Sequence, residues 1–188
     1  MPRRKRISDE AVLAAAMRVM ARTSPADYTL AAVAAEAGVS PATLVQRFGD
    51  KHALIVRAVA HDNEAFARML EALPPGRGPA ETMAVFLLLT PAAPDPDAFA
   101  DQLAWLRLDM RDPELRRLAQ ARFDLLRQAV AERAPPLPLT PLEAARVLEA
   151  QWQGALIQWG VAREGRLADY VVAALATWFS LVGGGQVA

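Results

Sequence analysis

The chain has 188 residues, and its 21 Arg and Lys residues balance 21 Asp and Glu residues, so the formal net charge is zero. It contains no cysteine, which excludes disulfides and cysteine-based metal sites and predicts a cytoplasmic location. The longest apolar stretch, residues 170–182, is shorter than the roughly 20 residues that span a bilayer, so no membrane partner is expected.

The first predicted helix begins after Ser8, whose hydroxyl suits an N-cap, and runs to about Arg22. Charge is unevenly distributed along the chain. Residues 1–51 hold eight Arg and Lys residues against five acidic residues, a balance of +3, whereas the remaining chain holds 13 against 16, a balance of −3. This split favours an N-terminal part that binds an anionic partner such as nucleic acid. The alternative is an ordinary solvated surface.

Residues 29–51 predict two short helices joined by a tight turn. Thr29 suits the N-cap of the first helix, and Gly38 supplies the left-handed conformation that ends it. Ser40 and Pro41 suit the N-cap and first position of a second helix that ends near Phe48. Gly49 then precedes Asp50, the expected cap of a longer helix. A helix-turn-helix is predicted, and this motif is typical of DNA binding.

These residues resemble the N-terminal domain of TetR-family transcriptional regulators over about residues 8–54. The shared pattern consists of Ala37-Gly38-Val39-Ser40, Thr43-Leu44, Phe48 and Lys51. Two positions depart from the family pattern. Val45 stands where the family usually has a phosphate-contacting tyrosine, and Arg47 stands where it often has histidine. Arg47 is still expected to reach a phosphate or a guanine edge.

The resemblance implies a recognition helix in the major groove of double-stranded DNA, with phosphate contacts from hydroxyls and helix N-termini. In this frame Gln46 pairs with adenine and Lys51 holds the DNA backbone. The basic segment at residues 3–6 has two open interpretations, an arm in the adjacent minor groove or a solubilising end. The predicted DNA-binding residues are Arg4, Lys5, Arg6, Thr29, Ser40, Pro41, Ala42, Thr43, Val45, Gln46, Arg47 and Lys51.

Beyond the motif, helices alternate with proline-rich breaks, and no stretch alternates with the period of a strand. Thr140-Pro141-Leu142-Glu143 has the spacing of a capping box. The fold is predicted to be all-α with about nine helices. We expect a DNA-binding domain at residues 1–50 and a regulatory and dimerisation domain at residues 51–188. The further helices are predicted at about residues 50–73, 80–89, 97–110, 113–133, 141–165 and 167–182.

The last helix is apolar around most of its circumference, more than packing on one neighbour requires. This pattern predicts contact with a second subunit, and the resemblance implies a homodimer built through the last two long helices. A helix buried wholly within one subunit is the alternative. The predicted interface residues are Trp159, Val171, Leu175, Trp178 and Phe179.

The resemblance also implies a site for a small hydrophobic ligand in the C-terminal part, although aromatic and methionine residues at helical spacing also make ordinary cores. Catalytic residues, a metal site and a cofactor are not expected. His52 and His61, the two histidines, do not share a helix face. The predicted ligand-binding residues are Met83, Phe86, Trp105, Met110, Phe123, Trp152 and Gln153.

Three functional hypotheses follow. The favoured one is a homodimeric repressor, not an enzyme, that a small hydrophobic ligand releases from a pseudo-palindromic operator. The second is a DNA-binding regulator without a small-molecule inducer. The third is a helical carrier or adaptor protein whose helix-turn-helix is structural, which the basic N-terminal part and the complete motif disfavour.

Overall fold

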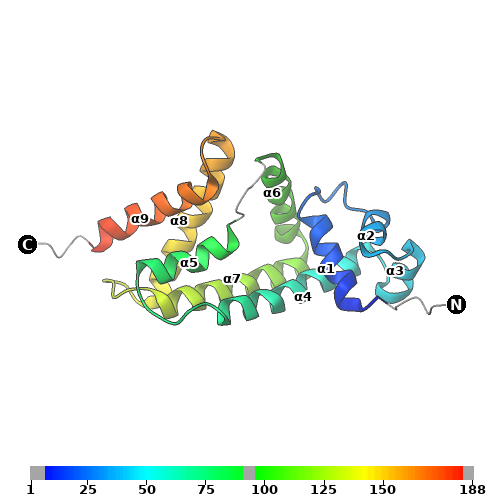
Figure 1. The fold of residues 1–188 in the computed structure, drawn as a ribbon, viewed down its shortest axis with the longest axis horizontal. Helices are drawn as coiled ribbons and strands as arrows, with labels where there is room; N and C mark the ends of the chain where they lie inside the picture. The colour runs from blue at the N-terminus through cyan, green and yellow to red at the C-terminus, as the bar shows by residue number, and fades with distance from the viewer. Residues whose placement is uncertain (1–6, 91–95, 184–188) are drawn as a thin grey trace, which may run out of the picture. The chain divides into compact units, whose positions relative to one another are not determined.

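A computed structural model describes residues 7–90 and 96–183 of the chain (Figure 1). These residues form nine helices and confirm the prediction of an all-α fold. The helices are α1 (Asp9–Met20), α2 (Leu30–Ala37), α3 (Pro41–Phe48), α4 (Lys51–Glu71), α5 (Pro79–Leu89), α6 (Pro96–Arg111), α7 (Pro113–Arg133), α8 (Pro141–Ala162) and α9 (Leu167–Gly183).

Capping residues that can be recognised in the sequence define the helix ends of the helix-turn-helix. Gly38 ends α2 in the left-handed region, at φ 69°, where a side chain would be strained. Pro41 follows the Ser40 N-cap as the first residue of α3. The four N-terminal caps accept hydrogen bonds from backbone N–H groups three residues later: Ser8 from Ala11, Thr29 from Ala32, Ser40 from Thr43, and Asp50 from Ala53.

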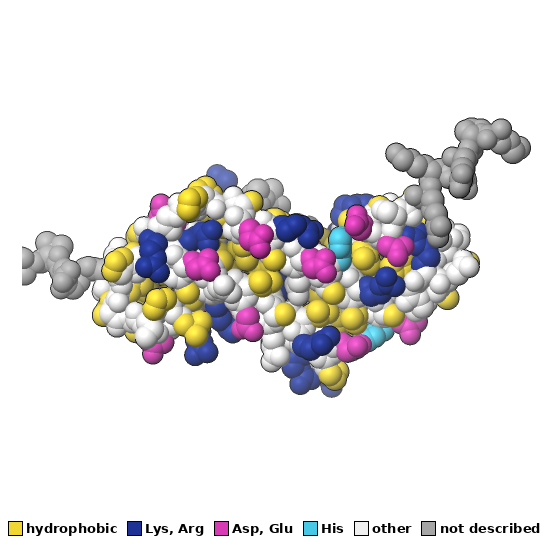
Figure 2. Space-filling model, turned by 90° about the horizontal axis from the view of Figure 1, so that it is seen from below, with side chains coloured by type: hydrophobic (Ala, Val, Ile, Leu, Met, Phe, Trp, Pro, Cys, Tyr) yellow, Lys and Arg dark blue, Asp and Glu magenta, His cyan; other side chains and the backbone are white. Residues whose placement is uncertain are grey.

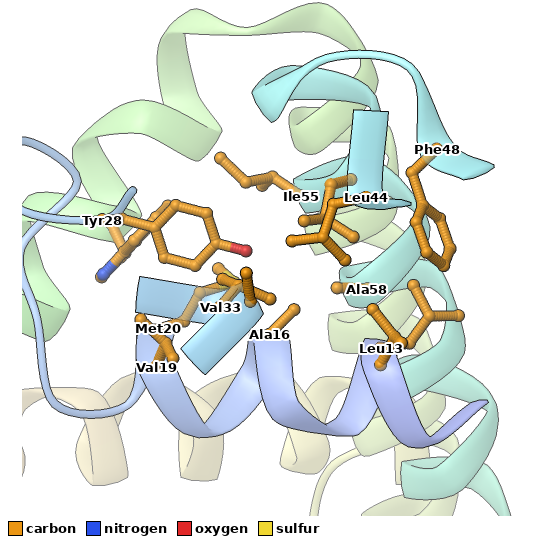
Figure 3. Packing of buried hydrophobic residues seen from close by; sticks show 14 of the residues in the cluster. Leu13, Ala16, Val19, Met20, Tyr28, Val33, Leu44, Phe48, Ile55 and Ala58 are labelled. Atoms are coloured by element: carbon orange, nitrogen blue, oxygen red, sulfur yellow. The ribbon is translucent and has the colours of Figure 1, made fainter. Parts of the chain in front are cut away.

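The described residues separate into two compact units, of which the first comprises residues up to Phe66 together with Asp97–Ala121. Its core joins α1, α2, α3 and the first part of α4 around Tyr28, Leu44 and Phe48 (Figure 3). Trp105 of α6 is part of this core, because its ring meets the Tyr28 ring edge-on with centroids 5.4 Å apart. Residues distant in sequence therefore support the helix-turn-helix.

The second unit comprises Ala67–Pro96 and the chain from Arg122 onward. Within it, α9 packs on α8 and α5. The Phe86 and Trp152 rings lie with centroids 5.7 Å apart, and the Trp152 indole N–H donates to the Thr90 hydroxyl over 3.3 Å. From the sequence we expected two functional domains that meet after residue 50. The two packing units are divided at other positions, and the functional boundary stays a prediction.

Two polar features position the helices of the second unit. Thr140 and Glu143 form the predicted capping box at the start of α8. Between α7 and α8, Arg127 donates to Glu149 with Nε 2.6 Å from Oε2, and the Glu149 side chain is only 7% exposed. Among the described helices, none combines the length and the apolar character needed to cross a membrane.

Candidate DNA interface

Helix α3 separates its apolar core face from an uncharged outer face. Leu44 and Phe48 point into the core of the first unit, as Figure 3 shows. Four of the predicted base-contacting residues are exposed, and they are Pro41, Ala42, Val45 and Gln46. Val45 is 50% exposed although it is apolar. Methyl groups on such a surface suit contact with thymine methyls, and a glutamine amide suits an adenine edge.

The hydroxyls at the starts of α2 and α3 lie on the exposed surface but also serve as caps. Ser40 Oγ accepts from the backbone N–H of Thr43 and lies 2.8 Å from Thr43 Oγ1. Thr29 accepts from the N–H of Ala32 over 3.1 Å. These bonds fix the helix N-termini, where the helix dipole favours an anion such as phosphate.

Lys51 contacts the segment between α1 and α2. Its ammonium donates to the Pro25 carbonyl oxygen over 3.0 Å and lies 5.6 Å from the centre of the Tyr28 ring. The side chain is half-buried. Because an ammonium has three N–H donors, the bond to Pro25 leaves donors that a phosphate can accept from, and the predicted role of Lys51 in holding the DNA backbone stays a prediction.

Arg47 is bonded within the subunit. Its guanidinium donates from Nε to Asp9 Oδ1 over 2.8 Å, from Nη2 to the same oxygen, and from Nη1 to the Ile7 carbonyl over 3.0 Å. The Arg47 side chain is only 17% exposed. The sequence contained no local signal for these contacts, because the partners lie 38 and 40 residues away.

Arg57 also lies close to Arg47 and Phe48. It was not among the residues predicted to bind DNA. Its guanidinium lies 4.8 Å from the centre of the Phe48 ring, and the Arg47 guanidinium lies 5.4 Å from the same ring. Arg57 Nη1 also donates to the Arg47 carbonyl over 3.3 Å. Phe48 is thus part of the hydrophobic core and also makes cation–π contacts with two guanidinium groups.

The remaining cations of the described N-terminal part join α1 to α2. Arg18 Nε and Arg22 Nη2 lie 2.7 and 2.6 Å from the two carboxylate oxygens of Glu36. The bonds from Arg18 and then Arg22 hold the pKa of Glu36 below its usual value. On the face shown in Figure 2, basic and acidic side chains are interspersed. The predicted contacts of Arg4, Lys5 and Arg6 lie outside the described residues.

The predicted ligand-binding residues are divided between the two units. Trp105 and Met110 belong to the first unit, where Trp105 donates to the Thr23 carbonyl over 2.7 Å and Met110 is 63% exposed. In the second unit, Phe86 and Trp152 are buried. Also in the second unit, Met83, Phe123 and Gln153 are half-buried, and Gln153 donates to the buried Glu149. The ligand role stays a prediction.

An open pocket of about 210 Å³ lies elsewhere in the second unit and contains none of the seven residues predicted to bind a ligand. Arg133 lines this pocket and is buried, with its guanidinium donating to the carbonyls of Ala129, Leu70 and Leu73. Its Nε is buried without a hydrogen-bond partner among the described residues. Leu73, Pro74, Ala80, Glu81 and Ala84 form the rest of the lining.

All five predicted interface residues are already buried within a single subunit. Val171 and Leu175 are 0% exposed, Trp159 is 3% exposed, and Trp178 and Phe179 are each 9% exposed. Their role in an interface between subunits stays a prediction, and other apolar side chains of α8 and α9 are exposed. The large apolar residues exposed there include Ile157 at 51%, Val161 at 81%, Val172 at 36% and Leu181 at 77%.

These features define a class of protein. A capped helix-turn-helix whose second helix is exposed is typical of DNA-binding proteins. Residues 12–58 match the family model of bacterial regulatory proteins of the tetR family. This N-terminal part of the chain is therefore a DNA-binding domain of the tetR-family type.

Solved structures share this fold along almost the whole chain. A transcriptional regulator from Rhodococcus sp. Rha1 is 20% identical with a TM-score of 0.74, covering 96% of this chain and 99% of its own. A putative transcriptional regulator from Saccharomonospora viridis in complex with choline is 20% identical at 0.69, covering 92% and 95%. The multidrug binding protein EbrR complexed with proflavin is 23% identical at 0.61, covering 90% and 98%. No curated protein sequence matches the chain.

Proposed function

We propose that this regulator is a cytoplasmic homodimeric repressor that binds a pseudo-palindromic operator and leaves it when a small hydrophobic ligand binds. The observation that carries the operator proposal is the exposed, uncharged surface of α3. Pro41, Ala42, Val45 and Gln46 are all accessible there, next to helix N-termini that suit phosphate. Two such helices related by a two-fold axis read half-sites one helical turn or a multiple of it apart.

The proposal of a dimer is supported by the exposed apolar residues of the last two helices. Helices α8 and α9 pack on each other, and each leaves large apolar side chains in solvent. Ile157 and Val161 lie one turn apart and share a face of α8, whereas Val172 and Leu181, nine positions apart on α9, do not share a face. Apolar surface of this kind is a frequent mark of contact between proteins. A two-fold related copy would bury this surface and set the spacing of the two recognition helices.

The proposal of a ligand is supported by the complexes with proflavin and choline in proteins of the same fold. In this chain the candidate site is the part of the second unit where Phe86 and Trp152 pack together. Gln153 and the ion pair of Glu149 with Arg127 supply polar groups in the same unit. A few such groups in an apolar surrounding are typical of small-molecule sites.

A gel shift with the DNA that flanks the protein's own gene tests operator binding. We expect a shift at low protein concentration that persists in excess non-specific duplex. Gln46→Ala should reduce the preference for the operator while leaving the salt dependence unchanged, because a base contact releases no phosphate counterion. Gln120→Ala, an exposed change on α7, is the matched control. Equal binding to every duplex would contradict sequence-specific recognition.

Proflavin and choline are the first probes for ligand release. Release of the bound DNA by either compound, with a parallel rise in thermal stability of the free protein, would support a ligand-responsive repressor. Operator binding that no compound in a broad small-molecule panel changes would favour a regulator without an inducer.

The dimer is tested by Ile157→Glu, which places two charges near one another across a two-fold axis. We expect a folded monomer in sedimentation and weaker operator binding, since a monomer reads one half-site. Met69→Glu, a change at a residue of α4 that is 46% exposed, is the control. A stable dimer of the Ile157 variant at low micromolar concentration would contradict an interface at this residue.

A further inference from the structure

The open pocket of the second unit is separate from the site proposed for a hydrophobic ligand. It has a volume of about 210 Å³, and its lining comes from the residues after α4, the first turns of α5 and the last residue of α7. Neither Phe86 nor Trp152 lines it. Sites for drug-sized ligands have about 300–1,000 Å³, so this pocket suits a smaller molecule. Apart from Glu81 and Arg133, the lining residues are apolar, and none is aromatic.

The positive charge of Arg133 is already used within the subunit. Nη1 donates to the Ala129 carbonyl over 3.2 Å and lies 3.7 Å from Glu132 Oε2. Nη2 donates to the carbonyls of Leu70 and Leu73 over 3.3 and 3.5 Å. These acceptors match the N–H groups of the two Nη atoms, and Nε is buried. An anion in the pocket would therefore find no accessible donor on Arg133.

The Glu81 carboxylate, in contrast, is available. Glu81 is the third residue of α5, where a glutamate commonly accepts a hydrogen bond from the backbone N–H of the N-cap residue. Here that residue is Gly78, and its N–H donates instead to the Arg133 carbonyl over 2.9 Å. The half-buried Glu81 side chain has no hydrogen bond or ion pair with any residue that the structure describes. The pocket thus contains a carboxylate without a cation.

Two glycines make room for this carboxylate. A Cβ atom at Gly78 would lie 2.5 Å from Glu81 Oε2, and a Cβ atom at Gly76 would lie 3.0 Å from Glu81 Cγ. With a side chain at either position, the Glu81 side chain would have to move. The turn before α5 therefore lets the carboxylate lie close to the backbone, at the edge of an apolar pocket.

We propose that this pocket binds a small alkylammonium ion, whose N–H groups donate to the Glu81 carboxylate and whose alkyl chain packs on the apolar lining. A carboxylate is a strong acceptor for a charged N–H group. Quaternary ammonium ions, which have no N–H, are typically held by aromatic rings, and this lining contains none. The site is additional to the proposed site for a hydrophobic ligand, and it does not depend on operator binding.

A titration of the full-length, ¹⁵N-labelled protein with n-butylammonium chloride tests the proposal by NMR. We expect saturable shifts of the backbone N–H signals of Gly76, Gly78 and Ala84, with a dissociation constant on the order of 1 mM for so small a ligand. The indole N–H of Trp152 should not shift. The absence of a saturable shift at Gly78 would overturn the proposal, and so would saturable shifts confined to Trp152. Neither result bears on operator binding, which is measured separately.

Two further probes separate charge from hydrogen bonding. 1-Butanol has a similar alkyl chain without the charge, and tetramethylammonium chloride has the charge without an N–H donor. Each should bind at least about tenfold more weakly than n-butylammonium. Equal binding of 1-butanol would overturn recognition by the carboxylate. Equal or tighter binding of tetramethylammonium would overturn the assignment of an N–H donor.

Glu81→Gln removes the charge but keeps the size of the side chain and its ability to cap α5. It should weaken n-butylammonium binding about tenfold or more. Glu71→Gln is the matched control, because it makes the same change of charge at an exposed residue at the end of α4 that does not line the pocket. Its binding should equal that of the wild type. Equal weakening by both changes would indicate general attraction to acidic groups and would overturn the site.

Ala84→Leu provides an independent variant if Glu81→Gln does not fold. Ala84 is half-buried and lines the pocket, so a leucine there should fill the space for the alkyl chain while the Glu81 carboxylate is retained. We expect the shifts at Gly76 and Gly78 on addition of n-butylammonium to be lost. Wild-type affinity in the folded Ala84 variant would overturn the proposal that the ligand occupies this pocket.

Discussion

Both units contain polar contacts between segments distant in sequence, but they differ in how many of their helices begin at a local side-chain cap. In the first unit, four helices are capped by residues three positions before the N–H group that they accept. In the second unit, buried polar groups are joined across distant segments, as in the bond from Thr82 to the Arg133 carbonyl, 51 residues away. Local contacts can be inferred from sequence spacing, whereas distant ones depend on how the helices pack. Function can therefore be read more directly from the first unit.

The largest expected effect concerns the interior of the second unit. Leu175→Glu places a carboxylate at a position that is 0% exposed, with no cation introduced to pair with it. The free energy of unfolding should fall by about 3–5 kcal/mol. Thermal unfolding followed by circular dichroism measures this loss, with separate probes for the two units.

Leu181→Glu is the control for this prediction, because it lies on the same helix and is 77% exposed. It should change the stability of the monomer by less than about 0.5 kcal/mol. Equal destabilisation by the two changes would contradict the assignment of Leu175 to the interior and Leu181 to the surface.

The ion pair between α7 and α8 gives the next largest effect. Glu149→Gln leaves the Arg127 guanidinium, whose pKa the Glu149 carboxylate raises, without its buried partner. We expect a loss of about 2 kcal/mol in urea denaturation, less than for a fully buried pair because Arg127 is 29% exposed. Asp124→Asn removes the other carboxylate near Arg127, which is 74% exposed, and should cost little. Similar losses of stability in the Glu149 and Asp124 variants would contradict the conclusion that burial of the carboxylate determines the cost.

Much of the fold could be predicted from the sequence because helix ends are local. Thr29, Gly38, Ser40 and Pro41 define the helix-turn-helix by their own conformational preferences, and the structure places each as expected. The nine helices follow from apolar periodicity and from prolines in the breaks, so the all-α class was also accessible.

The roles of individual side chains were less accessible. Trp105 was assigned to a ligand site, yet it packs on Tyr28 in the first unit, because the element that carries it returns to a segment more than 70 residues earlier. Arg47 was assigned to DNA, and its partners near the start of the chain have no mark in the local sequence. Apolar periodicity showed that α9 is buried but not whether its own subunit or a partner covers each face.

A smaller effect is expected from a carboxyl group of the first unit. Burial, with a further contribution from Asp112, raises the pKa of Asp109 to about 6. The folded protein then binds a proton more tightly than the unfolded chain, so stability falls as pH rises from about 4 to about 6. Asp109→Asn should raise stability at pH 7 by about 1 kcal/mol, allowing for solvent screening of a partly exposed group. Denaturation at pH 7 and pH 4 should show a gain at pH 7 alone, and an equal gain at both would contradict this cause.

The smallest expected effects come from removing one buried hydroxyl in each of the two units. Tyr28 is 0% exposed, and its hydroxyl has no hydrogen-bond partner among the described residues, while burial raises its pKa. Tyr28→Phe removes an unpaired polar group but keeps the ring contact with Trp105, so unfolding should require about 0.5 kcal/mol more. Thr82→Val in the second unit removes a buried hydroxyl that donates to two carbonyls, and should cost about 1 kcal/mol. Urea midpoints at unchanged m-value measure both. Changes of the same sign would show that hydrogen bonding of the buried hydroxyl does not distinguish the two units.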